Sequence, residues 1–150
     1  MTLRWMLAAA HLLALGIGLG AVWVRARALR SDLDGGALRR AFAADSFWGL
    51  AGALWIGSGL WRLLAGTEKS TGYYLQNHMF FAKIGFLVLL LLLELWPMVT
   101  LVRWRRGVTP DVRRARRIAG ISYAQAALVV LMVFAATAMA RGIGAGDANR

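Results

Sequence analysis

The sequence contains four apolar runs, each close to the length that a helix needs to cross a bilayer: 5–24, 42–64, 77–102 and 118–140. A hydrocarbon core of about 30 Å takes roughly 20 helical residues, and lipid forces each spanning segment to satisfy its own backbone hydrogen bonds. Of the 150 residues, 59% are hydrophobic, which exceeds the share in ordinary soluble domains. We therefore expect one all-α transmembrane domain over residues 1–150, an antiparallel four-helix bundle.

The positions of the cations predict the orientation of this bundle. Twelve lie between the first and second runs or between the third and fourth: Arg25, Arg27, Arg30, Arg39, Arg40, Arg103, Arg105, Arg106, Arg113, Arg114, Arg116 and Arg117. The remaining connection and the two tails hold five: Arg4, Arg62, Lys69, Arg141 and Arg150. Because cytoplasmic loops carry the Lys/Arg excess, both termini are predicted to lie outside a bacterial inner membrane.

The net charge of +11 follows from these flanking arginines. Arginines beside apolar spans pair with anionic lipid headgroups, so the bilayer is the expected partner and nucleic acid is not. The first run resembles a signal peptide, but the arginines directly after it favour a retained helix. In the connections, Asp34 and Thr109 are expected to cap the helices that follow them.

Polar and small residues recur at helical spacing within each run and predict the faces that pack together. His11, Gly18 and Arg25 mark the first helix, and Asp45, Gly52 and Gly59 the second. Lys83 and Glu94 mark the third, and Gln125 and Met132 the fourth. Ionisable side chains inside a span are costly and commonly functional, so these residues are the candidate site.

Depth along the bundle separates the candidates into two groups. At 1.5 Å per residue, His11 and Lys83 lie level, each roughly 10 Å below the outer surface, with Arg62 above them. Glu94 and Gln125 lie level in the inner half, with Asp45 nearer the cytoplasm. The outer half of the interior is thus expected to be positive and the inner half negative. Pro97 frees the carbonyl of Leu93, which Glu94 and Gln125 are expected to satisfy.

Two cofactors suit the outer group. A haem needs an imidazole on its iron and cations for its propionates, which His11, Lys83 and Arg62 supply, with Met132 or His78 as further candidates. Copper is the alternative, because imidazole and thioether ligands suit Cu(I); His11 and His78 would then be the metal ligands. The chain has no cysteine, which excludes disulfides and thiolate sites.

The sequence also resembles an uncharacterised bacterial family of four-helix inner-membrane proteins. The resemblance is carried by His11, Ala44-Asp45, Trp48-Gly49, Gly59-Leu60-Trp61-Arg62, Tyr73-Tyr74, Phe80-Phe81-Ala82-Lys83, Pro97 and Arg103-Trp104-Arg105. More distantly, the chain is similar to the four-helix protoporphyrinogen IX oxidases and to membrane copper-resistance proteins. The oxidases use a histidine of their first helix as a haem b ligand and a lysine of their third, and these roles would fall on His11 and Lys83.

Three functions remain open at this point. The first is a haem b protein with a redox-related role, the second a copper or small-solute permease-like protein, and the third an accessory membrane subunit without catalysis. A homo-oligomer or a membrane redox partner is compatible with each of them. No phosphate-binding loop accompanies the spans, which excludes an ATP-driven machine as a single chain.

Overall fold

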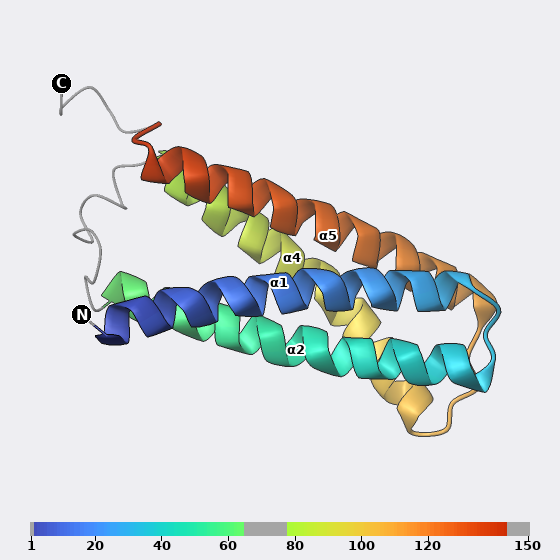
Figure 1. The fold of residues 1–150 in the computed structure, drawn as a ribbon. Helices are drawn as coiled ribbons and strands as arrows, with labels where there is room; N and C mark the ends of the chain where they lie inside the picture. The colour runs from blue at the N-terminus through green and yellow to red at the C-terminus, as the bar shows by residue number, and fades with distance from the viewer. Residues whose placement is uncertain (1, 65–77, 144–150) are drawn as a thin grey trace.

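The computed structural model describes residues 2–64 and 78–143, which are helical apart from short connections (Figure 1). The helices are α1 (Thr2–Arg30), α2 (Gly35–Leu64), α4 (His78–Arg105) and α5 (Val112–Ala140). Three of them, α1, α4 and α5, contain segments long and apolar enough to cross a membrane. The prediction of a helical chain with several spans is confirmed for the described residues, but α2, the second of the four predicted spans, is not among these three helices.

The helices lie side by side, and their two short connections come together at one end of the molecule (Figure 1). We call this the connection end; it holds residues 31–34 and 106–111. The beginning of α1 and the end of α5 lie at the opposite end, here called the terminal end. Contacts are extensive between α1 and α2, between α1 and α5, and between α4 and α5. The pair α2 and α4 approaches much less closely, so one side of the bundle is loosely packed.

The helices extend beyond the apolar runs at the connection end, which corrects the predicted boundaries. Helix α1 continues to Arg30 and α2 already begins at Gly35, because alanine, leucine and arginine sustain a helix outside an apolar run. The predicted cap of α2 is confirmed, since the Ala37 N–H donates to the Asp34 carboxylate. The predicted cap at Thr109 is wrong: Asp111 caps α5 and accepts from the first-turn N–H groups.

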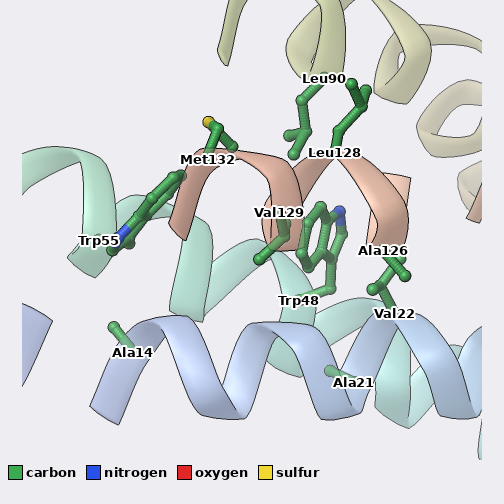
Figure 2. Packing of buried hydrophobic residues seen from close by; sticks show 10 residues of the cluster. All are labelled: Ala14, Ala21, Val22, Trp48, Trp55, Leu90, Ala126, Leu128, Val129 and Met132. Atoms are coloured by element: carbon green, nitrogen blue, oxygen red, sulfur yellow. The ribbon is translucent and has the colours of Figure 1, made fainter. Parts of the chain in front are cut away.

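Two apolar clusters fill the interior. The first joins α1, α2, α4 and α5 in the middle of the bundle and contains Ala14, Ala21, Val22, Trp48, Trp55, Leu90, Ala126, Leu128, Val129 and Met132 (Figure 2). The second lies at the connection end and contains Ala28, Leu29, Ala41, Leu101, Trp104, Ala115, Ile118 and Ala119. The many alanines bring the helix backbones close together, as packing between membrane helices requires.

The three glycines predicted to face neighbouring helices have different surroundings. A Cβ at Gly18 would lie 3.5 Å from Ala51 and from the Trp48 ring, and one at Gly59 would lie 3.2 Å from His11. Both glycines therefore sit at helix contacts, as expected. A Cβ at Gly52 would meet nothing within 4 Å, so the expectation that Gly52 packs against a neighbouring helix is wrong. It faces the loosely packed side between α2 and α4.

Candidate functional site

A fully buried arginine forms the centre of the polar interior. Arg25 lies on α1 with 0% of its side chain exposed, between the two apolar clusters. The prediction that Arg25 is a flanking cation is therefore wrong, whereas the prediction that it shares an inward face with His11 and Gly18 is confirmed. Helix α1 continues for more than a turn beyond Arg25, so its side chain remains inside the bundle.

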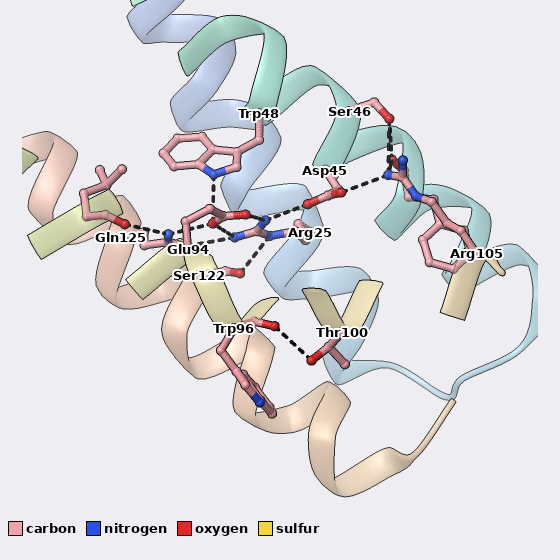
Figure 3. Close-up of polar contacts among 12 residues, drawn as sticks. Arg25, Asp45, Ser46, Trp48, Glu94, Trp96, Thr100, Arg105, Ser122 and Gln125 are labelled. Atoms are coloured by element: carbon pink, nitrogen blue, oxygen red, sulfur yellow. Dashed lines mark hydrogen bonds and ion pairs between the residues drawn. The ribbon is translucent and has the colours of Figure 1, made fainter. Parts of the chain in front are cut away.

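All five N–H donors of the Arg25 guanidinium are used (Figure 3). Nε donates to Ser122 at 3.0 Å, and Nη1 donates to Asp45 at 2.8 Å and to Glu94 at 2.7 Å. Nη2 donates to Glu94 and to Gln125, each at 2.8 Å. A guanidinium has no further donors, so Arg25 is saturated. Through this one side chain α1 is bonded to all three other helices.

Glu94 on α4 is the principal partner of Arg25, which it binds through both carboxylate oxygens. Such bidentate, charge-assisted pairs are among the strongest hydrogen bonds in proteins. Glu94 Oε2 also accepts from the Trp48 indole at 3.0 Å and from the Gln125 amide at 2.7 Å. Glu94 and Gln125, which were predicted to lie level, are thus bonded to each other. The Gln125 amide also donates to the carbonyl of Leu90 at 3.4 Å, rather than to that of Leu93 as predicted.

Asp45 on α2 links the buried arginine to a second one nearer the surface. Its Oδ1 accepts from Arg25, and its Oδ2 accepts from Arg105 on α4 at 2.9 Å. Arg105 is 36% exposed and also donates to the Phe42 carbonyl and to the Ser46 hydroxyl. These bonds, together with the one from Trp48 to Glu94, connect α2 with α4 although their backbones stay apart.

The charges of this network balance. Two guanidinium groups, of Arg25 and Arg105, face two carboxylates, of Asp45 and Glu94. The expectation of a negative interior in this half of the bundle is therefore wrong. Charges buried away from water are tolerated when they are paired and hydrogen-bonded. Here the partners of the carboxylates are Arg25 and Arg105, both of which were predicted to be loop cations.

An apolar cavity of about 230 Å³ lies beside this network, lined mainly by α2 and α4. Its walls include Leu87, Leu90 and Leu91 of α4 and the small residues Gly49, Gly52 and Ala53 of α2. Asp45 and Glu94 are the only ionisable side chains among its lining residues. Several wall residues are themselves exposed, Leu91 by 45% and Met98 by 47%. The cavity therefore opens sideways, on the loosely packed side of the bundle.

His11 has an ordered position on α1, held against α2. Its Nδ1 lies 2.9 Å from the Ser58 hydroxyl oxygen, and its ring stacks on Trp55 at 5.6 Å between centroids. The Ser58 hydroxyl donates its single hydrogen to the Trp55 carbonyl at 3.1 Å, so it accepts from His11. Nδ1 then carries the proton, and in the neutral imidazole Nε2 carries the lone pair. Gly59 gives the ring room, since a Cβ there would lie 3.2 Å from it.

Three of the other four predicted ligands have described side chains. Lys83 is half-buried in the second turn of α4, and α4 begins at the end of the molecule where α1 also begins (Figure 1). Met132 is 1% exposed and belongs to the central apolar cluster. His78 is exposed at the first turn of α4. The side chain of Arg62 lies outside the described residues. The residues that line the cavity beside Glu94 do not include Lys83, Met132 or His78.

His11 has the chemistry that a haem ligand needs, because a ligating histidine usually donates its other ring N–H to a fixed acceptor. Ser58 is such an acceptor. Over residues 2–64 and 78–143, however, no three His, Asp or Glu side chains come together as they would around a metal ion. Both the haem and the copper assignments remain predictions.

One signal in the sequence did point to Arg25. His11, Gly18 and Arg25 are spaced by seven residues, which keeps them on one side of a helix. All three face α2, as that spacing implies: His11 and Arg25 bond to Ser58 and Asp45, and Gly18 lies against Ala51. Counting Arg25 as a flanking charge overrode the periodicity, because an arginine at the end of an apolar run is more often interfacial.

These features define a class of protein: a multi-pass helical membrane protein with a charge-balanced polar network buried beside a lateral cavity. A family model described as "Predicted membrane protein (DUF2214)" matches residues 3–144. The chain belongs to this family of predicted membrane proteins. No match was found among curated proteins or among solved structures.

Proposed function

We propose that this protein spans a bacterial inner membrane four times as an antiparallel bundle with both termini outside, and that it binds a small lipid-soluble molecule in the cavity between α2 and α4. The excess of arginine at the connection end supports the orientation. With Arg25 removed from the count, that end still holds most of the cations. The charge of Asp45 is no obstacle to a span by α2, because two arginines neutralise it.

The topology is tested by labelling single cysteines introduced into this cysteine-free chain. A membrane-impermeant maleimide should label Gly144→Cys from outside the cell and leave Gly107→Cys unlabelled until the membrane is opened. Labelling of Gly107→Cys in intact cells would reverse the orientation. The chain offers a clean background for this test, since it contains no native cysteine.

One observation carries the binding function: an apolar cavity that opens sideways has two neutralised carboxylates at one end. Binding sites for small molecules are typically apolar with a few fixed polar groups. A cavity of about 150 Å³ in an apolar core holds a benzene ring, so 230 Å³ accommodates a ring-sized molecule. Because the opening faces the lipid, the ligand would enter from the bilayer.

The binding function is tested by filling the cavity. Gly52→Leu places a side chain in open space within the cavity, whereas Gly57→Leu places one in open space outside it. Organic extracts of the purified wild type and both variants are compared by liquid chromatography and mass spectrometry. A species retained by the wild type and Gly57→Leu but depleted in Gly52→Leu supports the proposal. Identical extracts from all three proteins would contradict it.

A haem b bound at His11 is the second candidate, favoured by the orientation of that imidazole against Ser58. The similarity of His11 and Lys83 to the haem ligand and the lysine of the oxidase family is part of this proposal. Protein from haem-replete cells should then show a Soret band that His11→Ala abolishes and Glu94→Gln preserves. A colourless wild type would remove this candidate, and metal analysis of the same sample would test copper.

A further inference from the structure

We infer that the ligand of this cavity is a neutral molecule with a hydroxyl group that donates its one hydrogen bond to the carboxylate of Glu94 or to that of Asp45. This inference rests on the proposed binding function and names the chemistry of the head group. It follows from the hydrogen-bond donors that surround Glu94 and from the acceptor positions left on Glu94 and Asp45.

The N–H donors of the three side chains that bond to Glu94 are all in use. Arg25 donates through its five N–H groups to five acceptor atoms. The Trp48 indole donates to Glu94, and the Gln125 amide donates to Glu94 and to the Leu90 carbonyl. A ligand that offered only acceptors, such as a ketone, an ether or an ester, would find no donor here unless it displaced an existing bond.

The carboxylates of Glu94 and Asp45, in contrast, have lone-pair positions that can accept further hydrogen bonds. A carboxylate has about four lone-pair positions, two on each oxygen. Glu94 Oε2 receives three hydrogen bonds, but Oε1 receives one, from Arg25. Asp45 receives one side-chain hydrogen bond on each oxygen. Both side chains line the cavity and are slightly exposed, by 18% for Glu94 and 13% for Asp45. The head group that matches these positions is a donor.

The charge balance decides between a neutral and a cationic donor. Two guanidinium groups already match the two carboxylates, so an ammonium head would add an unmatched positive charge. An unmatched charge in an apolar setting costs far more than a hydroxyl group. An alcohol or phenol avoids this cost and still donates a hydrogen bond.

One further donor belongs to the cavity wall but not to its polar end. The Trp55 indole N–H is buried and, in the part of the chain that the structure describes, has no hydrogen-bond partner. Trp55 is two helical turns from Trp48, or roughly 10 Å along α2. It is therefore too far away to donate a hydrogen bond to a head group placed at Glu94.

Three matched probes test the inference: 4-propylphenol, its methyl ether 4-propylanisole, and 4-propylbenzylamine. Each has one ring and a short alkyl chain, and they differ in being a neutral donor, a non-donor and a cationic donor. Their dissociation constants are measured by isothermal titration with the full chain in detergent. The same titrations on Gly52→Leu correct for partition into micelles, and Gly57→Leu serves as the matched control.

The phenol should bind the wild type and Gly57→Leu about tenfold or more tightly than the ether does, since a hydrogen bond to a charged group contributes at least this factor. Binding should be lost in Gly52→Leu. Equal affinities for phenol and ether would overturn the hydroxyl assignment while leaving the cavity as a binding site. Tightest binding of the amine would overturn the neutral assignment. If no probe distinguished the wild type from Gly52→Leu, the proposed binding function itself would fail.

Discussion

The buried polar groups in the two halves of the bundle differ in how many hydrogen-bond partners they have and in how many helices supply them. Toward the connection end, Arg25 and its partners form a network in which every donor of the guanidinium is paired and four helices contribute. Toward the terminal end, His11 lies against Ser58 and Trp55 of α2, and the neighbouring Trp55 N–H has no partner within the described residues. The first half is fixed by complementary charge, and the second by local packing.

This difference shows where the fold depends on hydrogen bonds and charge pairs between helices. In lipid there is little hydrophobic force between helices, so close packing and hydrogen bonds decide which helices associate. Helices α2 and α4 have little backbone contact and depend on the bonds from Trp48 to Glu94 and from Arg105 to Asp45. Removing polar groups from the two halves should therefore have unequal consequences.

The largest effect is expected from Arg25→Met. It leaves Asp45 and Glu94 buried without their shared partner, and breaking such a pair costs about 3–5 kcal/mol. The matched change in the other half, His11→Phe, removes one neutral hydrogen bond and should cost about 1 kcal/mol. Both losses of free energy are to be measured by unfolding in mixed micelles followed by circular dichroism. Equal losses would remove the distinction between the two halves.

A second effect, of about 1–3 kcal/mol, is expected from Gly59→Leu, because added bulk in a packed contact strains its neighbours. The side chain would meet His11 at the contact between α1 and α2. Gly57→Leu, on the same helix but facing open space, should leave the free energy of unfolding unchanged. A stable Gly59→Leu protein would mean that the His11 ring moves aside at little cost.

The two cavity tryptophans give a smaller and sharper contrast. Trp48→Phe removes a hydrogen bond to the Glu94 carboxylate and should destabilise by about 1–3 kcal/mol. Trp55→Phe removes a buried N–H that has no partner in the described part. The free energy gained because this N–H is no longer buried offsets the packing lost with the smaller ring. Its net effect should stay within about 1 kcal/mol of zero. Comparable destabilisation in both variants would indicate that the Trp55 N–H has a partner in the folded protein.

The smallest effect concerns Asp34, at the connection end outside the spans. The N–H of Ala37 donates to its carboxylate and lowers its pKa. A carboxylate with a lowered pKa stabilises the fold above its unfolded pKa of about 4 and loses that effect as the pH falls further. The difference in Tm between the wild type and Asp34→Ala should therefore shrink on acidification from pH 7 to below pH 4. A difference independent of pH would rule out the ionised cap.

Much of the fold was predictable because it depends on local features. The apolar runs gave the helices, the aspartate at position 34 gave the cap of α2, and the depth argument brought Glu94 level with Gln125, which are 2.7 Å apart across two helices. The site was predictable only in part. Arg25 was assigned to a flank and Gly52 to a helix contact, since neither a charge count nor a glycine reports which side of a helix faces a gap.

From the sequence alone it follows that this chain is helical, apolar along its helices and basic at one end. These features are local, because hydrogen bonding in lipid and the distribution of arginine are properties of each segment alone. The tertiary structure decided that Arg25 is buried, that its charge is matched, and that a cavity lies between α2 and α4. The partners of Arg25 lie 20, 69, 97 and 100 residues away along the chain. Which of them meet depends on how each helix is rotated and how closely it packs, and this is set only when all four helices come together.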